Sequence, residues 1–343
     1  MYIKKIVFAI SMIGLIVMGG LYYYIYNIVF DSNTAFNQEI KYIYISTGSD
    51  YNDLIQELRK HLKDPSSFSV LAKRKNYTNN IRPGKFIIKK GMNNNEIINS
   101  IRSNNVTVDL IFNNAKNIHD LASIVSKQIE ADSISLANTF FEKNNGFNDK
   151  TLLSMYLPNS YNLYWNTSSE DFKKRMLKEY ENFWSIDRLN KAKEIPLTPT
   201  EVMILASIVN EESKEISELS TIAGVYINRL KNNWLLQADP TVKFVAYKDP
   251  KYKNTVIRRV LNKHLRIDSE YNTYIYKGLP PGLISMPSIT SIDAVLNYES
   301  HEYFYFAADP ENPGFHNFAK NLREHRSNAR KYQKALSKKG IKK

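Results

Sequence analysis

The longest nearly uninterrupted apolar stretch of the chain covers residues 6–30 and contains no charged residue. Its 25 residues exceed the roughly 20 that a helix needs to cross a bilayer. Lys4 and Lys5 precede it, and four tyrosines lie near its end, as is typical of the membrane–water interface. The pattern predicts a single-pass transmembrane helix over 6–30, with residues 1–5 in the cytoplasm and the rest of the chain outside it.

Residues 31–41 are mostly polar and are predicted to form a linker. Residues 42–105 then alternate in a way that predicts a small βα unit. The expected elements are a strand over 42–45, a helix over 49–61, a strand over 85–90 and a helix over 94–103. This order resembles a LysM-like module, a fold often found in proteins that contact peptidoglycan. A spacer without a binding role remains an alternative.

The remaining residues, 106–343, are predicted to form a larger mixed α/β domain whose core spans 196–330. The overall fold class is therefore expected to be α+β, with a transmembrane helix, a LysM-like βα module and a larger mixed α/β domain. The elements expected before residue 196 are a strand over 106–112, helices over 117–127, 133–143 and 170–183, and a turn over 157–161.

A helix is predicted from Pro199, because Thr198 is a good N-cap and Glu201 follows it by three positions. Helical periodicity gathers several apolar residues on one side, and Glu212 extends that stripe. The residues of the stripe are Val202, Leu205, Ala206, Ile208 and Val209. A partly desolvated carboxyl has a raised pKa and suits proton donation to a leaving oxygen. Alternatively, Glu212 is a residue of a frayed helix end, or it pairs with Arg229.

Polar groups suited to sugars follow this helix. Residues 237–241 place an amide, a carboxylate and a hydroxyl at a proline turn. Asp239 is equally interpretable as a turn or helix cap. The run 303–307 is predicted to be a buried aromatic strand, and a lone His316 is more often structural than functional.

Composition narrows the classes of function. Lys and Arg total 47 against 34 Asp and Glu, but the basic residues are spread widely, so no nucleic-acid partner is expected. The chain has no cysteine, which excludes disulfides and thiolate catalysis. The six histidines are scattered and none is followed by a second histidine four residues on, so no metal site is expected.

Five motifs occur in order along the chain, at residues 206–212, 225–230, 236–242, 271–274 and 278–282. Taken together, they resemble the MltG (YceG-like) endolytic murein transglycosylases. The resemblance implies lytic cleavage of the β-1,4 bond between N-acetylmuramic acid and N-acetylglucosamine in nascent glycan strands, as a terminase of glycan elongation. It also implies 1,6-anhydro ends, no cofactor, and Glu212 as the catalytic residue.

The same resemblance implies an anchor in the inner (cytoplasmic) membrane, a periplasmic or extracytoplasmic catalytic domain, glycan strands as partner, and peptidoglycan synthases as candidate partners. The bilayer would be contacted through residues 6–30. Candidate substrate contacts are Gln237, Asp239, Thr241, Tyr271, Asn272 and His316.

Three positions depart from the family pattern: Asn210 stands where Glu is common, Met286-Pro287-Ser288 where Asn-Pro-Gly is common, and His325-Arg326 at a late His-Asn pair. These positions leave the outer substrate contacts open. Two rival functions also stay open. One is a glycoside hydrolase in which Asp239 activates water for Glu212, and the other is a non-catalytic cell-wall-binding scaffold.

Overall fold

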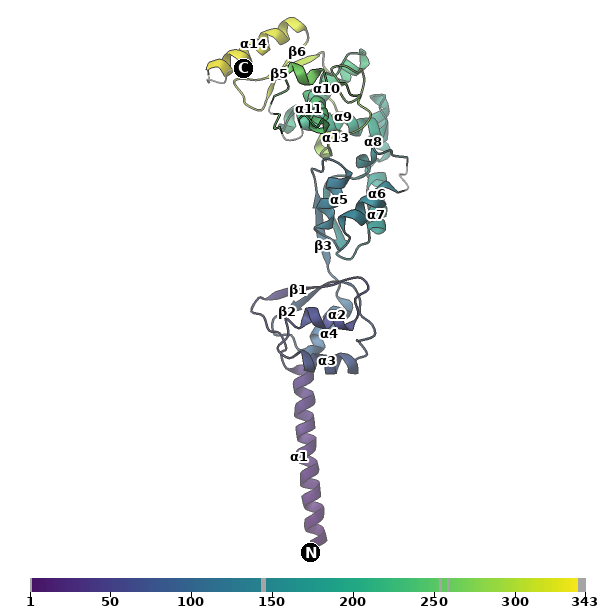
Figure 1. Cartoon of the computed structure of the whole chain (residues 1–343), viewed down its shortest axis with the longest axis vertical. Helices are drawn as coiled ribbons and strands as arrows, with labels where there is room; N and C mark the ends of the chain where they lie inside the picture. The colour runs from purple at the N-terminus through teal and green to yellow at the C-terminus, as the bar shows by residue number, and fades with distance from the viewer. Residues whose placement is uncertain (1, 143–145, 253–254, 258, 339–343) are drawn as a thin grey trace. The chain divides into compact units, whose positions relative to one another are not determined.

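The computed structural model describes residues 2–142, 146–252, 255–257 and 259–338. The predicted helix end at Lys143 lies outside this range. The protein is mixed α/β, and the chain divides into two compact units (Figure 1). One unit comprises residues 1–110, 128–131 and 161–168, and the other comprises residues 111–127, 132–160 and 169–343.

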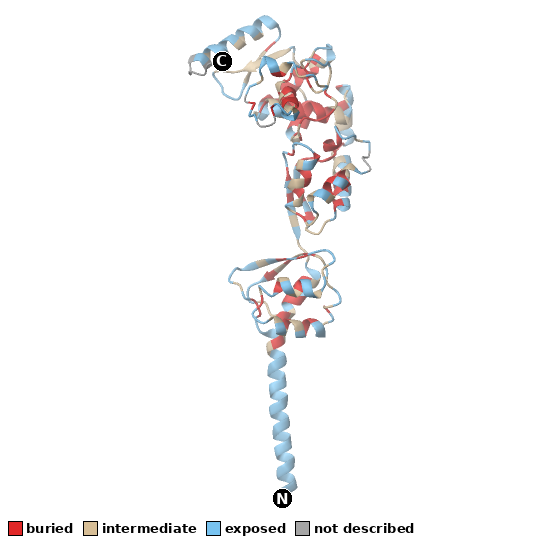
Figure 2. Ribbon diagram, in the orientation of Figure 1, coloured by how far each residue is buried: buried red, intermediate tan, exposed pale blue. Residues whose placement is uncertain are grey.

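The first unit begins with helix α1 (Tyr2–Phe30), which is long and apolar enough to cross a membrane. At about 1.5 Å per residue, its 29 residues extend roughly 44 Å, longer than the hydrocarbon core of a bilayer. Its side chains are exposed along almost the whole length (Figure 2). Only Ile28, in the last turn, is buried, and it packs in the core of the unit that follows.

The rest of the first unit is built on a two-stranded antiparallel sheet. Strands β1 (Ile40–Ile45) and β2 (Gly84–Lys89) pair with Tyr42 opposite Ile87. Side chains alternate along these strands, so one face is buried against helices and the other is open. The predicted strands and helices of this unit are confirmed, and one further helix, α3, was not predicted. The helices are α2 (Tyr51–Leu58), α3 (Pro65–Arg74) and α4 (Asn94–Ser103).

The stretch after α1 is tied into this unit more tightly than a polar linker would be. Asn33 and Thr34 are both buried. The Asn33 carboxamide accepts from Asp64 N at 2.6 Å and donates to Asn94 Oδ1 at 2.6 Å. Asn94 Nδ2 in turn donates to the Ile28 carbonyl at 2.8 Å, so the end of α1 is fastened to the unit by buried hydrogen bonds.

The second unit is mainly helical, with short paired strands. The boundary between the units falls within β3 and β4, which pair with each other, and β5 pairs antiparallel with β6. The elements are β3 (Thr107–Phe112), α5 (Ile118–Ser126), α6 (Ser133–Phe141), a 3-10 turn (Leu152–Met155), β4 (Asn159–Tyr164), α7 (Ser169–Phe183), α8 (Ile186–Glu194), α9 (Pro199–Glu212), a 3-10 turn (Ile216–Glu218), α10 (Leu219–Lys231), α11 (Asp239–Lys248), α12 (Asn262–Leu265), α13 (Ile289–Leu296), β5 (Tyr305–Ala308), β6 (His316–Ala319) and α14 (Leu322–Lys338).

Helix α9 is the central helix of this unit. Its predicted start is confirmed: Thr198 caps the helix, Pro199 is its first residue, and the Thr198–Glu201 capping box is formed. The predicted single apolar stripe is wrong, because all eight residues of 202–209 are buried. The helix is apolar all round because it lies in the interior, packed against α8, α10, α11 and α13.

Three other expectations are corrected by the structure. Residues 159–161, predicted as part of a turn, begin strand β4. The residues after Ala238 do not end in a proline turn, since Asp239 and Pro240 begin helix α11, where proline is tolerated in the first turn. The strand predicted over 303–307 begins at Tyr305, and its side chains are half-buried rather than buried.

Candidate active site

Glu212 is the last residue of α9 and is half-buried. Its Oε1 accepts a hydrogen bond from the hydroxyl of Tyr226 on the neighbouring helix α10. No described residue donates a hydrogen bond to Oε2, so this oxygen remains available to a ligand. The alternative pairing with Arg229 is not formed in the described part of the chain, because the Arg229 guanidinium bonds elsewhere.

The surroundings of Glu212 favour its protonated form. Burial raises the pKa of Glu212 from its ordinary value of 4.5 to about 7, and the negative charge of Asp239 adds to this effect. The hydrogen bond from Tyr226 and the charges of Lys243 and Arg229 act in the opposite direction. A carboxyl with a pKa near 7 is well matched to both giving and taking a proton at neutral pH.

Asp239 is the second acid at this site. It is half-buried at the start of α11, where a carboxylate is favoured by the helix dipole, and its Oδ1 accepts a hydrogen bond from Tyr274 Oη at 2.6 Å. Burial and the Asp239 charge raise the pKa of Tyr274, so its hydroxyl stays a donor. Asp239 therefore lies close enough to Glu212 for its negative charge to raise the pKa of Glu212.

Arg229 is a buried cation beside these acids. Its Nε donates to the Phe304 carbonyl at 2.8 Å, and the guanidinium also bonds the Leu236 carbonyl. It lies 5.6 Å from the centre of the Tyr305 ring. Because carbonyls rather than a carboxylate hold this guanidinium, its positive charge still acts on Glu212.

Replacing Glu212 with Gln should increase the free energy of unfolding at pH 8. The pKa of Glu212 is about 7 in the folded chain, against an ordinary value of 4.5. At pH 8 the folded protein must therefore hold a carboxylate in surroundings that favour the protonated acid. This opposes folding by up to about 3 kcal/mol above pH 7, and the penalty disappears as the pH falls to 4.5. Thermal denaturation should show a gain of about 1–3 kcal/mol at pH 8 and none at pH 4.5. An equal change at both pH values would contradict the buried carboxylate.

Two of the six candidate substrate contacts lie inside the protein. Thr241 is fully buried, and its hydroxyl donates to the Ala238 carbonyl at 2.7 Å and bonds Thr273 Oγ1 at 2.9 Å. Asn272 is also fully buried, with Nδ2 donating to the Leu265 and Ile267 carbonyls. The Thr241 hydroxyl joins the start of α11 to the segment around Tyr274, and Asn272 holds that segment to residues 265–267. Both residues therefore support the position of Asp239 and Tyr274.

Gln237 and Tyr271 lie nearer the surface. Gln237 is exposed and has a backbone φ of +48°, a left-handed conformation that turns the chain into α11. Tyr271 is half-buried, and its ring centroid lies 4.8 Å from that of Phe244. Lys248 Nζ lies 4.0 Å from the Phe244 ring centroid. The exposed amide and the aromatic pair are of the types that bind sugars through hydrogen bonds and ring faces.

His316 lies in the β5–β6 hairpin and is paired with Glu218. Its Nδ1 is 3.0 Å from Glu218 Oε2, and its backbone N donates to Oε1 at 2.8 Å. The His316 ring is perpendicular to that of Phe306, which is itself perpendicular to Tyr226. One aromatic ring therefore separates His316 from the tyrosine that bonds Glu212.

No role was predicted for Tyr226, Lys243, Tyr274 or Glu218 from the sequence. A signal for Tyr226 does exist, because it falls on the buried face of α10, and a buried tyrosine hydroxyl requires a partner. Which partner it has depends on how α9 and α10 pack. No group of three or more His, Cys, Asp or Glu that could hold a metal ion occurs among the described residues.

A hollow of about 530 Å³ lies beside the N-terminal half of α9. It is lined by Glu201 and Ile204 of α9, by Ile227 and Lys231 of α10, and by the turn at 278–281. Ile204 precedes Glu212 by eight residues, or about 12 Å along the helix. The Pro-Pro-Gly turn is therefore placed near the start of α9 rather than beside Glu212.

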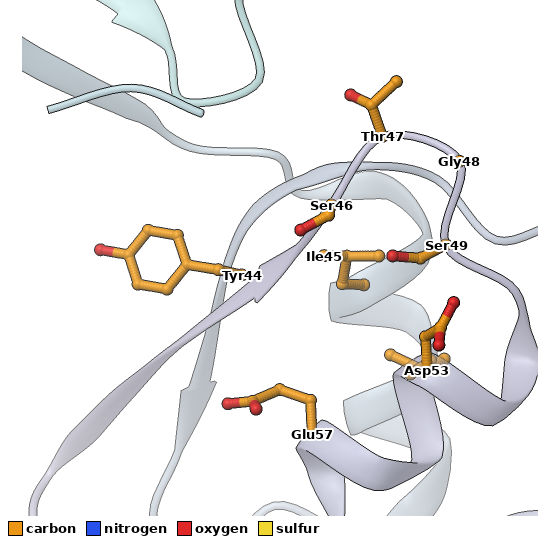
Figure 3. A pocket seen from close by; sticks show the side chains of 9 residues that line it. Tyr44, Ile45, Ser46, Thr47, Gly48, Ser49, Asp53 and Glu57 are labelled. Carbon is orange, nitrogen blue, oxygen red and sulfur yellow. The ribbon is translucent and has the colours of Figure 1, made fainter. Parts of the chain in front are cut away.

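The first unit has a separate polar hollow of about 460 Å³ at the loop between β1 and α2 (Figure 3). Hydroxyl side chains of Ser46, Thr47 and Ser49 surround it, together with the carboxylates of Asp53 and Glu57. Thr47 also bonds Glu130 through its backbone N at 2.6 Å and its hydroxyl at 2.7 Å. Both partners belong to the first unit.

The chain is similar to proteins described as endolytic murein transglycosylases. The match to that of Bacillus subtilis is 36% identical over 49% of this chain and 44% of the relative. The match to that of Streptococcus pneumoniae is 25% identical over 87% of this chain and 59% of the relative. The chain thus spans only about half the length of these relatives.

A crystal structure of a yceG-like protein from Listeria monocytogenes has a similar fold, with a TM-score of 0.55 and 24% identity. The similarity covers 85% of this chain and 99% of the crystallised one. The model of the YceG-like family matches residues 43–331, which include both units and every residue of the site around Glu212. The chain belongs to the YceG-like family.

Proposed function

We propose that this protein is an endolytic lytic transglycosylase of murein, with Glu212 as its single acid and base. The observation that carries the proposal is the Glu212 carboxyl, with a pKa raised to about 7, one oxygen bonded by Tyr226 and the other available to a ligand. The names of the relatives from Bacillus subtilis and Streptococcus pneumoniae support the same reaction.

In the proposed reaction, protonated Glu212 gives its proton to the oxygen of the bond between N-acetylmuramic acid and N-acetylglucosamine. The C1–O bond breaks, and N-acetylglucosamine leaves with a free 4-hydroxyl. The Glu212 carboxylate then takes the proton of the C6 hydroxyl of the muramoyl residue, and that oxygen bonds C1 to form the 1,6-anhydro ring. No water is consumed, and Glu212 ends protonated as it began.

The six candidate substrate contacts are proposed to have different roles. Asp239, Gln237 and Tyr271 are the candidates to touch sugar, since their polar or aromatic groups are half-buried or exposed. Thr241 and Asn272 are fully buried and would act by holding the chain around Asp239. His316 would act through Phe306, whose ring lies between it and Tyr226, with Glu218 fixing the His316 ring.

The domain arrangement and location are part of the proposal. The order β1, α2, α3, β2 with an antiparallel strand pair supports a LysM-like module over residues 42–105, followed by a catalytic domain over 106–343. Helix α1 supports a membrane anchor over 6–30. Lys4 and Lys5 favour a cytoplasmic N-terminus and a catalytic domain outside the inner membrane, where peptidoglycan synthases are candidate partners.

Product analysis tests the reaction. Full-length protein in a non-ionic detergent should convert uncrosslinked glycan strands into shorter strands with 1,6-anhydro-muramoyl ends, identified by mass spectrometry. Internal cleavage is expected, because the relatives are named endolytic. Strands with reducing ends would instead indicate a hydrolase in which Asp239 activates water. Binding without any cleavage would indicate a cell-wall scaffold.

A further inference from the structure

Helix α14 (Leu322–Lys338) carries a strong local excess of positive charge. Its sequence contains six Lys and Arg and one Glu. Four of the cations recur at helical spacing and are all exposed: Arg323, Arg326, Arg330 and Lys334. At about 100° per residue, they fall within an arc of roughly 80° and extend about 16 Å along the helix. We call these four residues the α14 basic stripe.

The stripe points away from the protein. The half-buried residues of α14 are on the opposite side of the helix and include His325, Ala329 and Tyr332. The His325 ring is stacked on Tyr305 of β5 with centroids 5.2 Å apart. Figure 2 shows α14 mostly in the colour of exposed residues, lying beside the β5–β6 hairpin. The apolar side of the helix is thus already occupied by the hairpin, and the cationic side is open.

Among the described residues, no carboxylate lies within 4.0 Å of a cation of the stripe. Arg330 Nε donates to the Arg326 carbonyl at 3.3 Å, within the helix itself. Four unpaired cations in one row repel one another, which is tolerated in water but attracts a ligand with several negative charges. Arginine is the side chain best suited to carboxylate and phosphate, because its planar fork makes two parallel hydrogen bonds.

The stripe is also connected to the site of Glu212. Phe306 of the hairpin packs against Tyr226, the hydrogen-bond partner of Glu212. The Phe304 carbonyl, just before β5, accepts from Arg229. A polymer bound along α14 would therefore lie on a helix that packs against the same hairpin as the site.

We propose that the α14 basic stripe binds the carboxylate groups of the peptide stems on a murein strand, so that the protein favours peptide-bearing over stem-free glycan. This inference rests on the proposed function. The N-acetylated sugars of the strand are neutral, so the stems carry its repeated negative charge. A row of cations about 16 Å long can contact more than one carboxylate at once.

A lipid surface fits the same stripe less well. Helices that bind membranes through their side bury an apolar face in the lipid, together with basic residues. The apolar face of α14 packs against the hairpin instead, and α1, the helix apolar enough to enter a membrane, belongs to the other unit. Binding of the stripe to anionic lipid would therefore overturn the proposal.

The test compares two variants of the full-length protein in non-ionic detergent. In one, Arg323, Arg326, Arg330 and Lys334 are all changed to Gln. In the matched control, four exposed cations of α7 and α8 are changed in the same way: Lys174, Arg175, Lys178 and Lys193. Each is assayed on uncrosslinked peptide-bearing glycan and on the same strands after an amidase has removed the stems.

The stripe variant should show about a tenfold higher KM on peptide-bearing strands at low salt, with kcat unchanged, and no change on stem-free strands. The difference should shrink as ionic strength rises, because the stripe is exposed. The control variant should match the wild type on both. Equal KM values for stripe variant and wild type, equal effects on both substrates, or a difference seen only when anionic vesicles are added would each overturn the proposal.

Binding measurements keep this inference separate from the proposed reaction. Fluorescent peptide-bearing strands can be titrated against the Glu212→Gln protein with and without the four stripe substitutions, since this protein should not consume them. The four stripe substitutions should raise the Kd of the Glu212→Gln protein about tenfold. If the wild type cleaves neither glycan, the proposed function fails, and this difference in Kd still decides whether the stripe binds stems. If cleavage occurs and Kd is unchanged, the stripe proposal alone fails.

Discussion

Glu212→Gln is expected to reduce kcat on uncrosslinked murein strands by at least about 1,000-fold, with little change in KM. A positioned acid or base typically contributes 100- to 10,000-fold, and here one carboxyl would perform both proton transfers. The amide keeps the shape of the side chain and can still accept the hydrogen bond from Tyr226, but it cannot give a proton. Release of anhydro-ended fragments under single-turnover conditions measures the loss.

The neighbouring Glu211 provides a matched control. It is exposed at the same helix end, and its Oε1 bonds Ser285 Oγ at 3.0 Å. Glu211→Gln should retain activity within a few-fold of the wild type, because this carboxylate is bonded by Ser285, whereas Tyr226 bonds Glu212. If both variants lost activity equally, the helix end would matter as a whole, and Glu212 would have no special role.

The rate should also depend on pH in a way set by the residues around Glu212. Its acid form must be present first, and its pKa is about 7, so kcat/KM should fall about tenfold for each pH unit above 7. Two substitutions should move this limb in opposite directions. Asp239→Asn removes a negative charge that raises the pKa of Glu212, and the limb should shift to lower pH. Lys243→Gln removes a positive charge that lowers it, and the limb should shift to higher pH.

The profile is measured as kcat/KM because that ratio reports ionisations of the free enzyme. Asp239 is also a candidate to touch sugar, so its substitution is expected to raise KM at every pH in addition to moving the limb. Lys174→Gln, an exposed change on α7, should leave the limb where it is in the wild type. Shifts of Asp239→Asn and Lys243→Gln in the same direction would contradict the electrostatic account.

Local signals in the sequence predicted several elements accurately. The capping residues Thr198 and Glu201 located the start of α9, and a helix over 94–103 was predicted with its observed bounds. Strand β4 was missed because Asn159 and Ser160 have turn-forming side chains, while their pairing with β3 is decided at long range. Polar helices such as α8 and α14 were missed because few apolar positions mark their period.

For the candidate site too, local signals in the sequence were predictive and contacts between distant residues were not. Glu212 was predicted from helical periodicity and from the family resemblance, although the periodicity argument assumed a stripe that the buried α9 does not have. Its hydrogen-bond partner Tyr226 and the Asp239–Tyr274 pair could not be predicted. They are separated from their partners by 14 and 35 residues, and packing alone brings them together.

The fastening of α1 to the first unit has a mechanical consequence. Ile28 is packed in the core, and Asn94 holds its carbonyl, while Asn33 joins the next residues to the same place. A domain joined to a membrane helix by a flexible linker can take many orientations. Buried hydrogen bonds at the junction instead hold the domain in one orientation relative to the helix. If α1 spans a bilayer, the orientation of α1 in that bilayer would therefore also set the distance of this unit from the membrane surface and its tilt.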